Sequence, residues 1–112
     1  MTLREKQSLF VQLVAQLILE ATMRGYALTF GEAYRTPEQA ALNAKKGTGI
    51  ANSLHTSRLA IDLNLFKDGK FLSATEAHRP LGEWWEQQHE LCRWGGRFSD
   101  GNHYSLSHGG KA

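Results

Sequence analysis

Three side chains that can bind a metal ion lie in two short segments of the chain. His55 and Asp62 stand in the first segment, and His103 stands in the second, near the C-terminal end. Two imidazoles and one carboxylate suit zinc, and three protein ligands leave its fourth tetrahedral position open for water, as in catalytic sites. The residue types therefore predict a split, catalytic zinc site made of His55, Asp62 and His103.

A second carboxylate, Asp100, precedes His103 by three residues. From there it can act on a metal-held water as a general base rather than as a fourth ligand. The segment Ser99–Asn102 is also typical of a tight turn, because Asp, Gly and Asn favour turn conformations. The two interpretations are compatible, since a base on the loop that delivers His103 stays close to the metal.

Seven residue steps separate His55 from Asp62, and a straight strand of that length would span roughly 23 Å at about 3.3 Å per residue. Two ligands of one metal cannot be so far apart. The chain must therefore bend within Thr56–Arg58, with His55 on a loop and Asp62 inside an apolar strand, Leu59–Phe66. The spacing alone is a weak signal, because five His and eleven acidic residues produce many such pairs by chance.

Both residues of the first segment also have an interpretation without metal. His55, beside Ser and Thr, could be an ordinary histidine of a surface loop. Asp62 is the only charged residue of its strand, and a buried carboxylate is costly unless it is paired or bound to a metal. Strand alternation nevertheless groups Asp62 with Asn64 and Phe66, opposite the leucines, so its side chain could also point to solvent.

The two motifs resemble the signature of the M15 family of zinc peptidases, which reads Ser-x-His, six residues, Asp, and far downstream an acidic residue, two spacers and His. The resemblance covers Tyr34 to Tyr104. Its nearest likeness is to single-domain phage endolysins that cut the L-alanyl–D-glutamate bond of peptidoglycan stems, and to related D-alanyl-D-alanine carboxypeptidases and dipeptidases. It implies zinc on His55, Asp62 and His103, with Asp100 catalytic.

Three further residues enter through this resemblance. Arg35 matches an Arg that faces substrate in relatives, and its guanidinium could hold a substrate carboxylate or steady the oxyanion. The alternative is a solvated charge ahead of a helix. Ser53 is expected to add a hydrogen bond to the bound peptide. Trp94 resembles the aromatic residue that precedes the catalytic Asp in relatives, which predicts that it forms one wall of the cleft.

The sequence departs from the family pattern at two places. Many members have Gly three residues after the first His, where this chain has Arg58, and only Gly adopts a positive φ there without cost. Relatives often read Phe-Glu after the second His, where this chain has Tyr104 and Ser105. No role of that Glu is therefore carried over.

Length and composition fit one small globular domain that covers residues 1–112. Of its residues, 41% are hydrophobic, which is ordinary for a folded domain. The net charge of +2 is spread along the chain and gives no basic stripe, so nucleic-acid binding is not expected. One cysteine excludes an internal disulfide and a CxxC zinc site.

Helical and strand patterns predict an α+β fold, in which helices flank a small, mostly antiparallel sheet that carries the zinc site with its loops. Trp84 and Trp85 are expected to pack in the core or at its rim, whereas His78 and His89 are expected at the surface. The tail Ser107–Ala112 is expected to fray. Three helices are predicted: Arg4–Met23, a second that begins after Thr36 and ends at Lys45, and Pro80–Leu91. Thr36 is expected to cap the second helix, with the Gln39 side chain reaching back to it. The predicted strands are Tyr26–Tyr34, Leu59–Phe66 and His103–Leu106, with a loop at Gly47–Asn52 and a hairpin turn at Lys67–Lys70.

The first predicted helix is amphipathic, its apolar run is too short to span a bilayer, and no signal-peptide cleavage site follows it. We therefore expect no membrane insertion and no export signal, and a chain made in the cytoplasm that reaches the cell wall through a separate lysis factor.

As the resemblance implies, the expected function is that of a monomeric zinc peptidase acting on peptidoglycan stem peptides. The alternatives are a D-alanyl-D-alanine carboxypeptidase or dipeptidase and a zinc-stabilised, non-catalytic wall-binding module; a structural site, however, needs no spare carboxylate such as Asp100.

Overall fold

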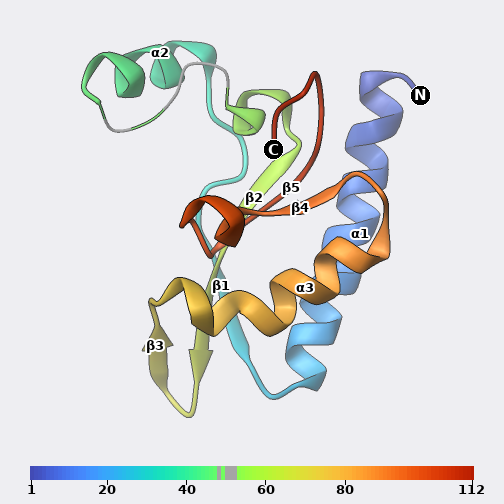
Figure 1. Ribbon diagram of the computed structural model, residues 1–112, viewed down its shortest axis with the longest axis vertical. Helices are drawn as coiled ribbons and strands as arrows, with labels where there is room; N and C mark the ends of the chain where they lie inside the picture. Colours follow the sequence, from blue (N-terminus) through green and yellow to red (C-terminus); the bar gives the residue numbers. More distant parts are fainter. Residues whose placement is uncertain (48, 50–52) are drawn as a thin grey trace.

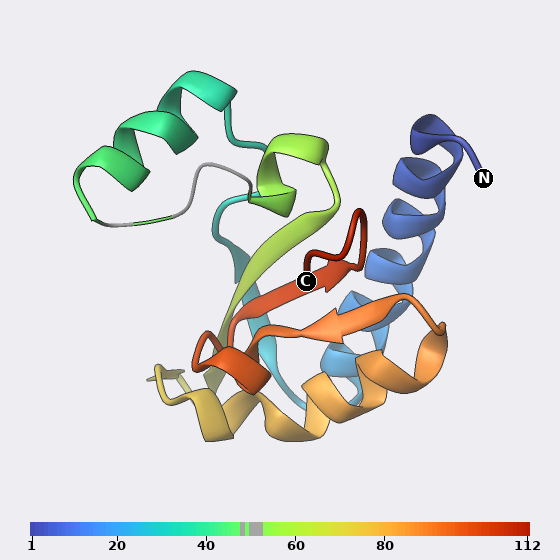
Figure 2. The same cartoon turned by 45° about the horizontal axis from the view of Figure 1, so that its top comes forward.

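The computed structural model describes residues 1–47, 49 and 53–112. Helices surround a small antiparallel sheet, which confirms the predicted α+β class (Figure 1). Helices α1 and α3 lie together beside the sheet, whereas α2 stands apart at the opposite end (Figure 2). The elements are α1 (Leu3–Met23), β1 (Ala27–Phe30), α2 (Pro37–Lys45), β2 (Ala60–Lys67), β3 (Lys70–Leu72), α3 (Arg79–Gln88), β4 (Cys92–Trp94) and β5 (His103–Leu106), with short 3₁₀ helices η1 (Leu54–Ser57), η2 (Thr75–His78) and η3 (Gly95–Phe98).

Strand β2 is the centre of the sheet. The strand order is β1-β2-β5-β4, with β3 paired to the end of β2 through a two-residue turn. Asp68 and Gly69 both have positive φ in that turn, as expected for an Asp-Gly hairpin. The inward face of β2 is buried at Ile61, Leu63 and Leu65, which confirms the alternation seen in the sequence.

The first helix supplies one side of the core. A capping box between Thr2 and Glu5 begins α1, and Gly25, with a φ of 90°, follows its end. Its apolar stripe is buried, as predicted from the periodicity. Among the described residues, no helix is long and apolar enough to cross a membrane. The buried residues of α1 are Phe10, Leu13, Val14, Leu17 and Ala21.

The second helix begins as predicted, with the Thr36 hydroxyl accepting a hydrogen bond from the Gln39 backbone N–H. The expected return contact is wrong, because the Gln39 side chain instead donates to Asn43, one turn further on. The loop expected at Gly47–Asn52 falls largely on residues 48 and 50–52, which lie outside the described residues.

Two predicted elements are too long. The strand predicted over Tyr26–Tyr34 ends at Phe30, and the helix predicted to Leu91 ends at Gln88. In the second case, Cys92–Trp94 leaves the helical path because it pairs with β5. Sheet pairing, which a local pattern does not contain, decides this boundary.

His78 was predicted at the surface, and this prediction is wrong. This side chain is buried, at 2% exposure, and its Nδ1 lies 2.8 Å from the Tyr104 hydroxyl. Trp85 is buried as expected, and its indole N–H donates to the carbonyls of Arg93 and Ser105. The tail does not extend freely either, since His108 pairs with Lys111 through two backbone hydrogen bonds.

Candidate metal centre

Strand register brings two of the predicted ligands together. Asp62 of β2 and His103 of β5 are direct partners in the antiparallel ladder. Directly opposed residues point their side chains to the same face of a sheet, with close Cβ atoms. Residues far apart in the sequence therefore meet because of how the two strands align.

The bend predicted between His55 and Asp62 is formed by η1. Ser53 begins this short helix, and its hydroxyl accepts a hydrogen bond from the His55 backbone N–H. Arg58 ends it with a φ of 56°, so the chain adopts the left-handed conformation without the glycine common in relatives. That conformation is costly for a residue with a Cβ, and the Arg58 guanidinium gains a contact in return by lying 3.9 Å from the centre of the Tyr34 ring.

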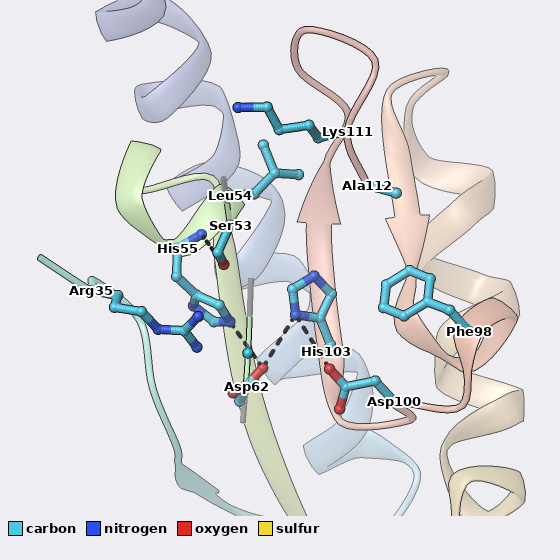
Figure 3. Close-up of a pocket in the computed structure, with 11 residues that line it drawn as sticks. Arg35, Ser53, Leu54, His55, Asp62, Phe98, Asp100, His103, Lys111 and Ala112 are labelled. Carbon is cyan, nitrogen blue, oxygen red and sulfur yellow. Dashed lines mark hydrogen bonds and ion pairs between the residues drawn. The ribbon is translucent and has the colours of Figure 1, made fainter. Parts of the chain in front are cut away.

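The three predicted ligands converge on one point (Figure 3). The Nε2 atom of His55 lies 3.3 Å from Oδ1 of Asp62, and the Nδ1 atom of His103 lies 3.4 Å from the same oxygen. One ligand atom from each residue lies within 4.8 Å of the others, a spacing that could hold a metal ion. The alternatives of a surface-loop His55 and a solvent-facing Asp62 are therefore wrong. His55 is buried, and Asp62 points between two imidazoles.

Hydrogen bonding selects the nitrogen of His55 that can bind a metal. Its Nδ1 lies 2.9 Å from the Ala33 carbonyl oxygen, which can only accept a hydrogen bond, so Nδ1 carries the proton. The bare Nε2 then faces Asp62. A metal-ligating His commonly donates its other ring N–H to a carbonyl in this way.

The donor set fits zinc. Oδ1 of Asp62 is buried and has no hydrogen-bond partner among the described residues, although a buried carboxylate oxygen is costly to leave unpaired. Nitrogen, oxygen and nitrogen donors are ligands that zinc accepts, and three of them match an open catalytic site.

The electrostatics favour a charged carboxylate at the centre. Burial favours the protonated form of Asp62, but contacts with His103 and His55 outweigh it and lower the pKa of Asp62 to about 2. Burial likewise opposes protonation of His55, yet the Asp62 carboxylate and the Ala33 carbonyl raise the pKa of His55 above its ordinary value. Asp62 is therefore ionised at neutral pH, as a metal ligand must be.

Asp100 lies beside the three ligands, on the loop before β5. Its Oδ2 atom is 3.8 Å from Nδ1 of His103, and its side chain is 52% exposed. Burial of the remaining part of the Asp100 side chain raises the pKa of Asp100 above the usual carboxyl value. The loop packs tightly, because a Cβ on Gly95 would overlap the Asp100 carbonyl and His103.

A comparison with protein families agrees with this geometry. A family model of M15 peptidases, described as D-alanyl-D-alanine carboxypeptidase, matches residues 46–106, more than half of the chain. This chain belongs to the M15 peptidase family. The matched segment contains the three candidate ligands and Asp100, whereas Arg35 precedes it. Members of the family are usually metal-dependent. A search of curated proteins found no match.

The M15 site opens into a cleft of about 380 Å³. Arg35 lines it, with its guanidinium pointing toward His55 (Figure 3). The side chain is only 15% exposed and is held by Glu32, which accepts hydrogen bonds from its Nε, at 2.8 Å, and from its Nη2. Arg35 is therefore fixed at the cleft wall rather than free in solvent, which corrects the alternative of a solvated charge.

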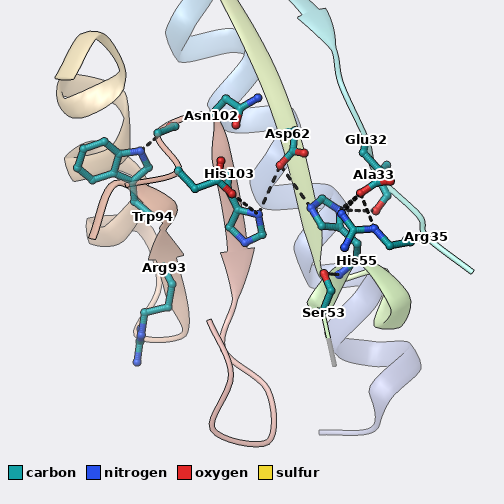
Figure 4. Close-up of polar contacts among 12 residues, drawn as sticks. Glu32, Ala33, Arg35, Ser53, His55, Asp62, Arg93, Trp94, Asn102 and His103 are labelled. Atoms are coloured by element: carbon teal, nitrogen blue, oxygen red, sulfur yellow. Dashed lines mark hydrogen bonds and ion pairs between the residues drawn. The ribbon is translucent and has the colours of Figure 1, made fainter. Parts of the chain in front are cut away.

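Of the two other predicted substrate contacts, Ser53 lines the cleft and Trp94 does not (Figure 4). Ser53 lines the cleft but is buried, and its hydroxyl already accepts the His55 N–H. Trp94 is fully buried, so the prediction that it walls the cleft is wrong. Its ring packs where any Cβ on Gly82 or Gly96 would overlap it, and its indole N–H donates to the Gly101 carbonyl at 2.7 Å. Trp94 therefore supports the Asp100 loop from beneath.

Sequence reasoning did not assign Phe98 or Glu32 to the site. Phe98 lines the cleft, and its ring packs edge-on against His103 with centroids 5.6 Å apart. Glu32 holds Arg35 and also lies 3.9 Å from Nδ1 of His55. The EAYR segment contains a visible signal for Glu32, since an acid three residues before a base can pair with it.

Proposed function

We propose that this M15 peptidase is a zinc-dependent hydrolase of peptidoglycan stem peptides, cutting the L-alanyl–D-glutamate bond as a phage or prophage endolysin. The observation that carries the proposal is the convergence of His55, Asp62 and His103 in an open cleft with Asp100 beside them. The three ligands would hold the ion. A free carboxylate next to them has a use in hydrolysis and none in a purely structural site.

Zinc, when bound, polarises the scissile carbonyl and acidifies a water molecule. Asp100 takes the proton from the attacking water and passes it to the leaving amine. A carboxylate with a raised pKa is a better base than an ordinary one, and Asp100 has such a pKa. The Ala33 carbonyl keeps His55 in the tautomer that presents Nε2.

Arg35 would bind a substrate carboxylate. Stem peptides carry several carboxylates, and a guanidinium offers a planar fork that matches one of them. Glu32 accepts one hydrogen bond from Nε and one from Nη2 of Arg35, so the two N–H groups of Nη1 and the second N–H of Nη2 are left for a substrate carboxylate. The exposed ammonium of Lys111, at the rim of the same cleft, adds a second positive charge.

A second candidate reaction is cleavage of the D-alanyl–D-alanine bond. It is favoured by the description of the matching family model, D-alanyl-D-alanine carboxypeptidase. Both reactions need the same metal, base and carboxylate-binding cation. They differ in the residues that flank the scissile bond.

Digestion of purified peptidoglycan by the zinc-loaded protein tests the proposal. Mass spectrometry of the products should reveal new D-glutamate amino termini; released D-alanine instead would establish the second candidate. Chelator-treated protein and the His103→Ala variant serve as inactive controls. The absence of any peptide product from zinc-loaded protein would contradict both reactions.

A further inference from the structure

A second hollow, of about 190 Å³, adjoins the cleft of the metal centre. Asp100 lines both spaces and so stands at their junction. The walls of the hollow come from β2, from β3 and the segment after it, from η2 and from the loop before β5. A substrate that reaches Asp100 from the metal side can therefore continue into this hollow.

The hollow continues the line of the metal ligands along the sheet. Asn64 lies two residues after Asp62 in β2, on the same face, and Asn102 directly precedes His103. Both asparagines are part-buried and line the hollow. A chain laid over the ligands in this direction would pass both amides.

The chemistry of the hollow differs from that of the main cleft. Of the described residues that line it, none is Lys or Arg, whereas the main cleft contains Arg35 and Lys111. Beside the Asp100 carboxylate and the His78 imidazole, its hydrogen-bonding side chains are amides and hydroxyls, and the exposed Phe71 ring also lines it. The amide nitrogen of Asn102 is 3.5 Å from the Asn64 oxygen, which is a long contact, and each amide can form up to four hydrogen bonds. The polar side chains around the hollow, besides Asp100, are Asn64, Ser73, Thr75, His78, Ser99 and Asn102.

The positions of the charges orient the substrate. In both candidate bonds the nearest carboxylate lies on the C-terminal side, on D-glutamate or on the last D-alanine. Arg35 attracts that side into the main cleft, so the N-terminal side falls beyond Asp100. Resting on the proposed function, we infer that the hollow is a subsite for the neutral, amide-bearing group N-terminal to the scissile bond. In the favoured reaction this group is the N-acetylmuramyl cap on the stem L-alanine.

Two substrates that differ only in this group test the subsite. One is N-acetylmuramyl-L-alanyl-D-glutamyl peptide, and the other is the same peptide with a free L-alanine amine. Two neutral hydrogen bonds to the amides predict a kcat/KM about tenfold higher for the capped peptide. Asn64→Ala and Asn102→Ala each remove one of the two hydrogen bonds, so in either variant this ratio should fall to about threefold, and in the double variant to about one. Gln87→Ala, which removes an exposed amide on α3, should keep the ratio of about tenfold. Zinc content is measured for every variant.

A binding measurement separates this inference from the proposed reaction. N-acetylmuramyl-L-alanine, added to ¹⁵N-labelled zinc-loaded protein, should shift the side-chain amide signals of Asn64 and Asn102, and free L-alanine should not. An equal kcat/KM for both peptides, or no shift of either amide, overturns the subsite even if hydrolysis occurs. Shifted amides without any hydrolysis would instead count against the proposed reaction.

Discussion

At the scale of single residues, the two carboxylates of the site are set apart by their surroundings. Asp62 lies between two imidazoles, which lower its pKa to about 2, whereas partial burial raises the pKa of Asp100. A permanently ionised carboxylate suits a metal ligand, and a more basic one suits proton transfer. Environment rather than residue type therefore divides the roles.

Asp100→Asn should retain zinc and the fold but hydrolyse little. Loss of a general base typically lowers the rate by about 10²–10⁴-fold, and Asp100 is not one of the three converging ligands. Metal content and peptidoglycan hydrolysis are measured on one preparation. Loss of zinc would identify Asp100 as a ligand, and unchanged hydrolysis would reduce it to a turn residue.

Arg35→Ala should lower peptide turnover while leaving the zinc content and the melting temperature nearly unchanged. The variant leaves Glu32 without its partner, but that side chain is 35% exposed and water can solvate it. Arg35→Lys, which keeps the charge without the fork, should recover only part of the activity. Full activity of Arg35→Ala, or its failure to fold, would assign the residue to the fold alone.

At the scale of elements, η2 and β5 are joined by a buried polar pair, His78 and Tyr104. Burial lowers the pKa of His78 to about 4, from an ordinary value of 6.5. Above the ordinary value the imidazole is neutral in both the folded and the unfolded chain. Below pH 6.5 the imidazole becomes protonated in the unfolded chain but stays neutral in the folded chain. The free energy of unfolding therefore decreases as the pH is lowered.

The wild-type protein should lose about 2 kcal/mol of unfolding free energy through His78 between about pH 7 and about pH 5. His78→Gln removes the titration, so its free energy of unfolding should fall by that much less over the same range. Urea denaturation of both proteins at the two pH values gives the comparison. Identical pH slopes would show that His78 titrates normally in the folded protein.

At the scale of the whole molecule, the metal centre joins segments that are distant in sequence. His55 belongs to η1, Asp62 to β2 and His103 to β5. A ligand that binds only the folded state stabilises it in proportion to its affinity. Zinc is therefore expected to act on the fold as well as on the chemistry.

Replacing His55, Asp62 or His103 by Ala should abolish stoichiometric zinc binding and the rise in melting temperature that zinc causes. Metal analysis and thermal melts with and without added zinc measure both effects. His89→Ala, outside the cleft, is the matched control. Stoichiometric metal in the His103→Ala protein would contradict the assignment.

Much of this molecule could be predicted from local sequence signals. Periodicity located α1, the Asp-Gly pair located the hairpin, and ligand types together with the M15-like motifs selected His55, Asp62 and His103, which converge in the structure. Features that depend on backbone partners could not be predicted. Residue types alone do not indicate that the Ala33 carbonyl orients His55. They also do not indicate the β4–β5 pairing that shortens α3 or the glycine contacts that bury Trp94.

The register that pairs Asp62 with His103 would make the proposed metal binding depend on correct strand alignment during folding. A slip of one residue between β2 and β5 would turn every side chain of the slipped strand to the other face of the sheet. The carboxylate and the imidazole would then lie on opposite sides and could not share an ion. On the proposed zinc assignment, the fraction of molecules that take up one zinc ion after refolding from denaturant would therefore count those whose central strands have found the native alignment.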